Sequence, residues 1–303
     1  MARITILHTT EYSYRNPVGL LRHRMMIRPR DSHDLRLHDA RLEVDPPPGT
    51  ERWAHDVFGN SLCLLEWPEA VRTERLRIVS LLDLTHFPAC PDLPVPTLDP
   101  AAETFPFSYA AHEVPDLARL TERHLPDPDR TVDAWARRFV AGKGEVRTLE
   151  LLAAMTHAIK AEFRYQARYE EGTRTPAETL RCGYGTCRDF AVLMMEAVRS
   201  LGLAAKFVTG YLYDHNFGEA RGGGATHAWC SVYLPGAGWV EYDPTNGLIA
   251  GANLVRIGMT RASEQAIPIA GGYLGGADDT LGLHVDVTVS AVPIEANARP
   301  FVA

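Results

Sequence analysis

The sequence predicts an α+β protein in which an N-terminal antiparallel β-sandwich-like domain precedes helices packed on a second antiparallel sheet. The first 87 residues contain several segments rich in β-branched and aromatic residues, beginning with ITILHTTEYSY, and they predict several short antiparallel strands. Gly59-Asn60, between Phe58 and the apolar run 62–65, predicts a hairpin. Seven prolines between residues 88 and 115 exclude a regular helix there. Beyond them, apolar residues recur at helical spacing and are followed by three strand patterns. The order of these patterns gives the fold class.

The same changes of pattern divide the chain into three parts. We expect a β-rich domain at 1–87, a proline-rich linker at 88–115, and a core at 116–303 that includes a closing strand. In that strand, LHVDVTVSAV, strict alternation predicts that one face is buried, formed by Leu283, Val285, Val287 and Val289.

The core contains three predicted helices and three predicted strands. Helices are expected to open near Thr131 and Thr148, and a third helix, with a strongly apolar face, is expected over 186–201. The predicted strands follow at 205–213, 227–234 and 238–243. The intervening segment Leu234-Pro-Gly-Ala-Gly238 predicts that the last two strands form a hairpin.

Composition excludes several classes of function. The net charge of −7 and the absence of a basic stripe argue against nucleic-acid binding. No stretch approaches the roughly 18 apolar residues of a membrane span, and the start, MARITILHTT, has no pattern of a secretory signal. We therefore expect a cytoplasmic protein that binds neither nucleic acid nor membrane, and in which a homo-oligomer stays open.

Five cysteines at scattered spacings suit reduced thiols better than a disulfide framework. Cys182 and Cys187 do not form a CxxC pair, which disfavours a thiol redox protein. His227 and Cys230 lack a second pair of ligands, so we expect no structural zinc. No calcium-binding loop of the EF-hand type is present, and we expect no metal and no cofactor.

Cys187 has a setting that the other cysteines lack. It follows the turn Gly183-Tyr-Gly-Thr186 and opens the apolar helix, with Thr186 as its predicted N-cap. A helix N-terminus lowers the pKa of a thiol, and its free N–H groups can stabilise an oxyanion. Cys63 and Cys230 lie in predicted strands, and Cys90 lies between prolines, so we expect these three to be unreactive.

A nucleophilic cysteine needs a base and a group that orients the base. His227 begins a predicted strand directly after the glycine-rich segment 215–226, where a loop can open and close over a substrate. Asp243 ends the next strand, so the predicted hairpin brings His227 and Asp243 together across the ladder. By itself, Asp243 before Pro244 is more typical of an ordinary Asp-Pro turn than of a catalytic residue.

The segments CRDFAVLMMEAVRSLGLAAKFVTGY and THAWCSVYLPGAGWVEYDPTNG resemble the core of the bacterial transglutaminase-like superfamily. LHTTEYSYRNPV, IRPR and DVFGN resemble the β-rich domain that accompanies this core in bacterial members, and the tail GMTRASEQAIPIAGGYLGG continues the resemblance. The resemblance implies a papain-like core, with helices packed on an antiparallel sheet.

The resemblance also implies a Cys–His–Asp triad, with Cys187 as nucleophile, His227 as base and Asp243 as orienter. It implies that the Cys187 N–H is one oxyanion donor. Tyr165 is our candidate for the second donor, or else an aromatic residue that closes the core. Trp229 is a candidate for substrate binding, or packs with Trp239 around the imidazole, and Asp189 is expected to stabilise the helix start.

Two segments depart from the family pattern, Cys230-Ser231 after His-Ala-Trp and the loop IGMTRASEQ, and they put the usual substrate in doubt. The implied reaction is acyl transfer from an amide of a peptide or protein through a thioester on Cys187. We expect hydrolysis, as in a peptidase or amidase, because water needs no second binding pocket. Transfer to an amine and a non-catalytic role in binding a peptide or partner protein remain open alternatives.

Overall fold

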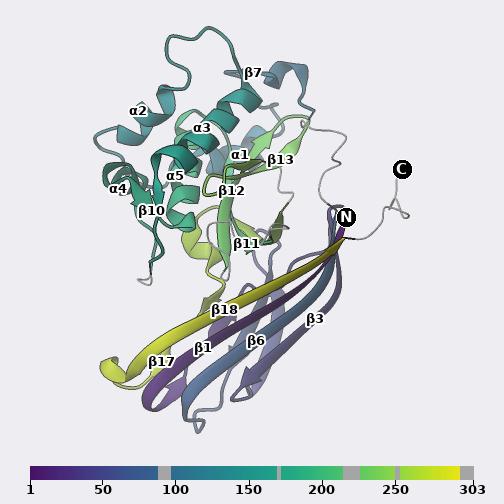
Figure 1. Cartoon of the computed structure of the whole chain (residues 1–303), viewed down its shortest axis with the longest axis vertical. Helices are drawn as coiled ribbons and strands as arrows, with labels where there is room; N and C mark the ends of the chain where they lie inside the picture. Colours follow the sequence, from purple (N-terminus) through teal and green to yellow (C-terminus); the bar gives the residue numbers. More distant parts are fainter. Residues whose placement is uncertain (88–96, 169–171, 214–225, 250–252, 294–303) are drawn as a thin grey trace.

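The computed structural model describes residues 1–87, 97–168, 172–213, 226–249 and 253–293. Figure 1 shows two layers of structure, with long strands on one side and a group of helices around a second sheet on the other. Cys90, the first part of the predicted linker and nearly all of the glycine-rich segment lie outside the described residues. No described helix is both long and apolar enough to cross a membrane.

The first sheet of the N-terminal domain is antiparallel and has unexpectedly long strands. Its order is β17-β1-β6-β3, and β18 also pairs with β1. Its strands are β1 (Ala2–Leu20), β3 (Leu35–Asp45), β6 (Thr73–His86), β17 (Tyr273–Leu274) and β18 (Thr280–Pro293). The prediction of only short strands is wrong, because buried and exposed residues alternate along β1 without a break from Ala2 to Thr10.

A second antiparallel sheet, of order β16-β2-β5-β4, completes the sandwich. It consists of β2 (His23–Met25), β4 (Thr50–His55), β5 (Ser61–Glu66) and β16 (Ile269–Ala270). The predicted hairpin around Gly59 is confirmed, since His55 pairs with Ser61 and Gly59 has a φ of 78°. A cluster of buried side chains fills the space between the two sheets, among them Met25, Ile27, Leu65, Leu76 and Ile78.

The closing strand differs from the prediction. Residues 280–293 pair with β1 along almost its whole length, so this strand extends the N-terminal sheet rather than the core. The prediction that Leu283 and Val285 are buried is wrong, although Val287 is buried. Alternation tells which residues share a face, but it does not tell which sheet accepts the strand or how far the facing layer reaches. The other domain boundaries stay predictions.

The core contains five helices among the described residues and a sheet of order β14-β13-β12-β11-β15. The helices are α1 (Val114–Thr121), α2 (Thr131–Arg137), α3 (Thr148–Glu162), α4 (Pro176–Cys182) and α5 (Cys187–Ser200). The strands are β11 (Ala205–Leu212), β12 (His227–Leu234), β13 (Gly238–Asp243), β14 (Leu248–Ile249) and β15 (Leu254–Thr260). The three predicted helices and the three predicted strands are confirmed, and none of the predicted ends is shifted by more than one residue.

Short elements connect these parts: β7 (Thr104–Phe105) pairs with β8 (Val146–Arg147), and β9 (Arg164–Tyr165) pairs with β10 (Tyr184–Gly185). Three 3₁₀ turns lie at Pro100–Ala102, Ser263–Ala266 and Ala277–Asp279. The described part of the linker runs against the core, where Leu98 is buried and the Asp99 N–H donates to the carbonyl of Pro235.

Helix α5 is the buried centre of the core. One face packs on the sheet against Cys230, Val232 and Tyr242, while α2, α3 and α4 cover its other sides. The helix is buried on nearly all sides, and its buried charges are paired, as Glu196 is with Arg199 at 2.9 Å. Helix α4 was missed in the sequence, although Thr175 and Glu178 form a capping box at its start.

The β-domain and the core share a buried interface. Ile4, Ile6 and Leu84 of the β-domain cluster with Tyr211 and Val255 of the core sheet. Buried histidines of the β-domain bond tyrosine hydroxyls of the core: His8 Nδ1 lies 2.8 Å from the Tyr211 oxygen, and His86 Nδ1 lies 2.9 Å from that of Tyr213. The two layers are therefore joined by packing and by polar contacts.

Candidate active site

Cys187 is the first residue of α5 and is 8% exposed. Thr186 is the N-cap, as predicted, and its side chain accepts a hydrogen bond from the Asp189 N–H, while Asp189 Oδ2 accepts one from the Thr186 N–H at 2.9 Å. This capping box fixes the first turn of the helix. Because the first N–H groups of a helix have no acceptor within it, the Cys187 N–H is a donor available to a ligand.

Asp189 does more than the predicted stabilisation of the helix start. It is fully buried, and its Oδ1 accepts hydrogen bonds from the Arg174 N–H at 2.7 Å and from Arg168 Nη2 at 3.2 Å. A Cβ on Gly185 would lie 2.9 Å from the Asp189 Cβ, so glycine is required where the turn passes this carboxylate. Asp189 therefore ties the segment before α4 to the start of α5.

The β12–β13 hairpin brings His227 and Asp243 together, as the spacing predicts. The strands pair from Leu234↔Gly238 to Cys230↔Tyr242, and His227 Nε2 lies 2.9 Å from Asp243 Oδ2. Both side chains are buried. The other ring nitrogen of His227, Nδ1, has no hydrogen-bond partner among the described residues. This nitrogen is free to exchange a proton with a thiol.

Asp243 is held by its own turn. Its Oδ1 accepts a hydrogen bond from the Thr245 N–H at 2.9 Å, and its Oδ2 accepts one from Asn246 Nδ2 at 2.9 Å. Sequence reasoning missed Asn246, although Asp-Pro-Thr-Asn-Gly is typical of a turn in which an aspartate accepts bonds from following N–H groups. Asp243 is thus both a turn residue and the partner of His227.

The charges of the pair explain the protonation of His227. Burial lowers the pKa of His227, but the Asp243 carboxylate, the hydrogen bond to it and the adjacent Cys187 raise this pKa to about 10. Burial likewise opposes the Asp243 charge, yet His227, Asn246 and Thr245 lower the pKa of Asp243. His227 is therefore an imidazolium at neutral pH, beside the Cys187 thiol.

Tyr165 lies near Cys187 because β9 and β10 pair in parallel, with Tyr165 opposite Gly185. The Gln166 N–H donates to the Gly185 carbonyl at 2.9 Å, which fixes this alignment. Burial, with a smaller contribution from the charge of Cys187, raises the pKa of Tyr165 to about 12. The half-buried phenol is thus protonated at neutral pH and can donate a hydrogen bond.

The two tryptophans have different positions. The Trp229 ring stacks on the His227 ring, with centroids 6.0 Å apart and an angle of 26° between planes, and Trp229 is fully buried. A contact of Trp229 with substrate stays a prediction. The expectation that Trp239 also packs around the imidazole is wrong, because Trp239 lies at the other end of the hairpin, against Tyr233 and Lys206.

The other described cysteines are separate from this centre. Cys63 and Cys230 are buried in strands, where burial raises the pKa of the Cys63 thiol to about 12 and that of Cys230 further. Cys182 is exposed at the end of α4. Within the described ranges, no three His, Cys, Asp or Glu side chains are placed to bind a metal ion.

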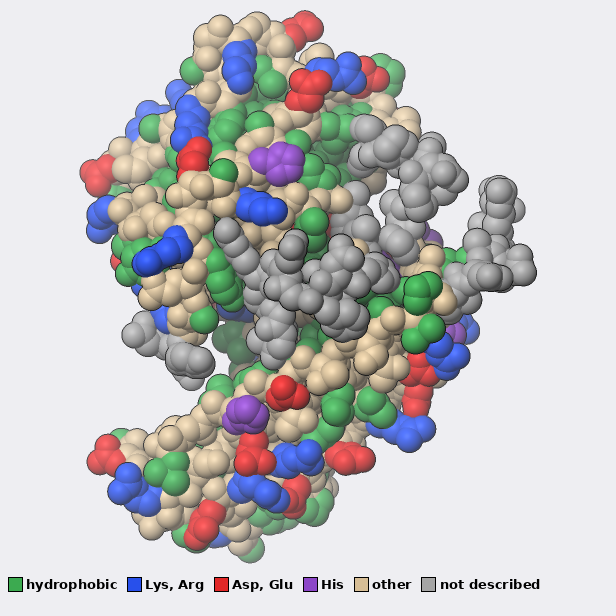
Figure 2. All heavy atoms as spheres, viewed as in Figure 1, with side chains coloured by type: hydrophobic (Ala, Val, Ile, Leu, Met, Phe, Trp, Pro, Cys, Tyr) green, Lys and Arg blue, Asp and Glu red, His purple; other side chains and the backbone are tan. Residues whose placement is uncertain are grey.

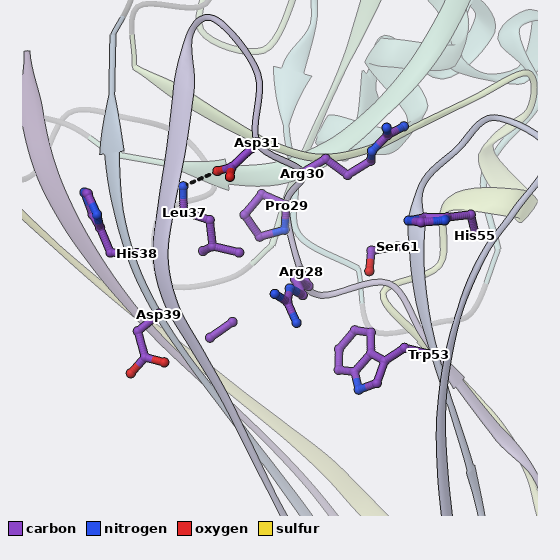
Figure 3. Close-up of a pocket in the computed structure, with 11 residues that line it drawn as sticks. Arg28, Pro29, Arg30, Asp31, Leu37, His38, Asp39, Trp53, His55 and Ser61 are labelled. Carbon is purple, nitrogen blue, oxygen red and sulfur yellow. Dashed lines mark hydrogen bonds between the residues drawn. The ribbon is translucent and has the colours of Figure 1, made fainter. Parts of the chain in front are cut away.

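A cavity of about 590 Å³ lies in the β-domain, lined by residues of the segment Arg28–Asp31 and of β3 and β4. Figure 3 shows Arg28 beside Trp53, whose ring centroid lies 5.5 Å from the guanidinium carbon. None of Cys187, His227 and Asp243 lines this cavity. On the face drawn in Figure 2, acidic and basic side chains are interspersed over both layers.

Comparisons with known proteins agree with this architecture. Residues 133–244 match the Transglutaminase-like superfamily, and residues 4–83 match the Bacterial transglutaminase-like N-terminal region. The uncharacterized proteins Rv2569c of Mycobacterium tuberculosis (strain ATCC 25618 / H37Rv) and Mb2599c of Mycobacterium bovis are each 30% identical over 305 residues, which cover 98% of this chain and 94% of the relative.

A solved structure shares the whole fold. The crystal structure of "a Putative Cysteine Protease from Cytophaga hutchinsonii" aligns with a TM-score of 0.67 at 18% sequence identity, covering 100% of this chain and 94% of that chain. At this identity the likeness is one of fold. Together with the two matched regions and the full-length relatives, it leads to one conclusion: the chain belongs to the transglutaminase-like superfamily, and carries the bacterial N-terminal region of that family before its core.

Proposed function

We propose that the protein is a cysteine-dependent hydrolase that cleaves an amide bond of a peptide or protein through a thioester on Cys187. The observation that carries this proposal is the buried His227–Asp243 pair, 2.9 Å between Nε2 and Oδ2, beside the only described cysteine that begins a helix. A histidine oriented by a carboxylate and adjacent to a thiol is the arrangement that acyl transfer requires.

The first half-reaction forms the thioester. The Cys187 thiolate attacks the amide carbonyl carbon, and the C=O π electrons move to oxygen. When the C–N bond breaks, His227 Nδ1 gives its proton to the departing amine, and Asp243 stabilises the imidazolium until that moment. The amine leaves as the first product, and the acyl group stays bound to Cys187 Sγ as a thioester.

The second half-reaction consumes water. His227, now neutral, accepts a proton from water as the oxygen attacks the thioester carbonyl, and the C–S bond breaks to release a carboxylic acid. The Cys187 N–H donates to the oxyanion in both steps, and Tyr165 is the second donor in this proposal, since its phenol is protonated and near the thiol.

The proposal is tested with purified protein and a peptide library, with and without an added primary amine. We expect new carboxyl and amino termini in the wild type, a mass adduct of the acyl fragment on Cys187 after acid quench, and loss of both in Cys187→Ala. Cys182→Ala removes a thiol five residues away, exposed and outside the centre, and is expected to keep full activity.

Iodoacetamide labelling at neutral pH gives an independent readout. Cys187 is expected to react faster than Cys63, which is buried in a strand. If Cys187 is labelled no faster than Cys63, or if Cys187→Ala retains turnover, Cys187 is not the nucleophile. An amide product in place of the acid when amine is present would assign amine transfer instead of hydrolysis.

A further inference from the structure

A chain of charged side chains runs from the β-domain to the tryptophan beside His227. Asp34, just before β3, accepts hydrogen bonds from Arg256 Nη2 at 3.0 Å and 2.9 Å. Arg256 lies on β15, and its Nη1 donates to Glu241 Oε1 on β13 at 2.5 Å. The guanidinium therefore bridges two carboxylates that come from different domains.

Glu241 is the inner end of this chain. It is 7% exposed, and burial raises its pKa, while Arg256 and the nearby Trp229 indole act in the opposite direction. The Trp229 N–H is buried and does not reach hydrogen-bond geometry with any described group. Glu241 pairs with Ser231, and Trp229 lies two residues before Ser231 on β12, so Glu241 and Trp229 are diagonal neighbours on one face of the sheet.

The backbone of β11 packs closely against the Trp229 indole at Gly210. Gly210 pairs with His227 on one side and with Arg256 on the other. A Cβ on Gly210 would lie 2.7 Å from Trp229 Cη2 and 2.1 Å from the Val255 carbonyl oxygen. The absence of a side chain at this position lets Trp229 lie close to the strand, so its ring has little room to move away from the His227 ring.

We propose that Asp34, Arg256 and Glu241 are positioning residues, which hold Trp229 against His227 and keep the imidazole aligned between Asp243 and Cys187. The β-domain thereby takes part in building the reactive centre through Asp34. The inference rests on the proposed function for its consequence in catalysis, but it concerns a geometry that is measurable in the unreacted protein.

Three substitutions grade the effect. Glu241→Gln keeps the shape of the side chain but removes the charge that pairs with Arg256, on the face of the sheet that carries Trp229. Arg256→Gln removes the bridge and leaves Glu241 buried without its cation. Asp34→Asn leaves the Arg256–Glu241 pair intact and loosens only the link to the β-domain. Arg3→Gln, which breaks an exposed pair with Asp83 on the outer sheet, is the matched control.

The readouts are the His227 imidazole signals in ¹⁵N NMR and the pH profile of Cys187 alkylation by iodoacetamide. Asp243 and Cys187 are the titratable groups that act on His227, and both stay in every variant. In Glu241→Gln and Arg256→Gln we expect the bond between His227 and Asp243 to weaken, which lowers the pKa of His227 by about one unit. The part of the alkylation profile that follows His227, near pH 10, should move down by the same amount. Hydrolysis of 4-nitrophenyl acetate should lose about tenfold in kcat with little change in KM.

Asp34→Asn is expected to give a smaller shift in the same direction, Arg256→Lys to restore part of it, and Arg3→Gln to give none. Unchanged imidazole signals and an unchanged limb in folded Glu241→Gln and Asp34→Asn would overturn the proposal, even if their melting temperatures fall. If Glu241→Gln does not fold, Asp34→Asn decides. If the wild type hydrolyses nothing, the proposed function fails, while NMR and alkylation still test the positioning.

Discussion

Buried histidines in the two domains have opposite protonation states. In the β-domain, His8 and His86 are nearly inaccessible to solvent and each bonds a tyrosine hydroxyl of the core. Burial lowers the pKa of both to about 4. In the core, His227 is at least as buried, yet Asp243 and Cys187 raise its pKa to about 10.

The difference teaches that burial alone does not set the charge of these residues. A hydroxyl satisfies the hydrogen bonds of a neutral ring but adds no charge, so desolvation decides and the ring stays neutral. A carboxylate at 2.9 Å supplies an opposite charge in a region that screens it weakly. The β-domain histidines therefore serve the interface, while His227 has the charge that proton transfer requires.

The largest expected effect comes from making His227 resemble His8. Asp243→Asn keeps a hydrogen-bond acceptor but removes the charge, so burial should lower the His227 pKa below 6.5. We expect kcat/KM for 4-nitrophenyl acetate to fall about 10³-fold, or about 4 kcal/mol of activation free energy. An NMR titration of His227 measures the pKa directly.

Asp278→Asn, at an exposed position, is the control for this change and should alter neither kcat/KM nor the pKa of His227. Retention of more than a tenth of the activity by Asp243→Asn, or a His227 that still titrates near pH 10, would show that Asp243 is not what charges the ring.

The next effect concerns stability in acid. His8 and His86 have a folded pKa of about 4 against 6.5, so the unfolded chain binds more protons between these values. Their contribution is present above pH 6.5 and is lost as pH falls to 4, by about 3 kcal/mol for each residue. Urea unfolding at pH 7, 5.5 and 4 measures this.

His86→Gln should be less stable than the wild type at pH 7 and lose less on acidification, whereas exposed His112→Gln should follow the wild type. His227 has the opposite sign: its contribution is complete below pH 6.5 and is lost as pH rises toward 10. An identical acid dependence in wild type and His86→Gln would contradict the assignment of a neutral interface histidine.

The smallest effect is expected at the surface. Arg3 Nη2 lies 2.6 Å from Asp83 Oδ2, closer than the His227–Asp243 pair, but the side chains are 56% and 29% exposed. Water screens such a pair, so Arg3→Gln should leave the urea midpoint of unfolding close to that of the wild type, and closer still in 0.5 M NaCl. A midpoint lowered as much as that of a variant with a buried substitution would mean that the distance between the charges matters more than their burial.

Much of the site could be predicted because its signals are local. Thr186 as N-cap and Cys187 as first helical residue follow from a glycine-containing turn before an apolar helix. The meeting of His227 and Asp243 follows from one hairpin with a short turn. The contacts of Arg256 with Asp34, 222 residues apart, could not be predicted, since neither residue lies in a distinctive local pattern.

The position of the closing strand shows the same limit. Its alternation marks residues 280–293 as a strand, but pairing with β1 is decided by which sheet offers a free edge, and this depends on the assembled β-domain. The exposure of Leu283 and the burial of Val287 on one face follow from how far the neighbouring layer extends.

By itself, the sequence determined the fold class, the helix that begins at Cys187, and the hairpin that carries His227 and Asp243. Only the tertiary structure decided which buried histidine has a raised pKa, that Trp229 stacks on it while Trp239 does not, and that Asp34 reaches the core through Arg256. The physical reason is that secondary structure and hairpins depend on near neighbours in the chain. Burial, screening and the charge on a side chain depend on every segment that packs around it.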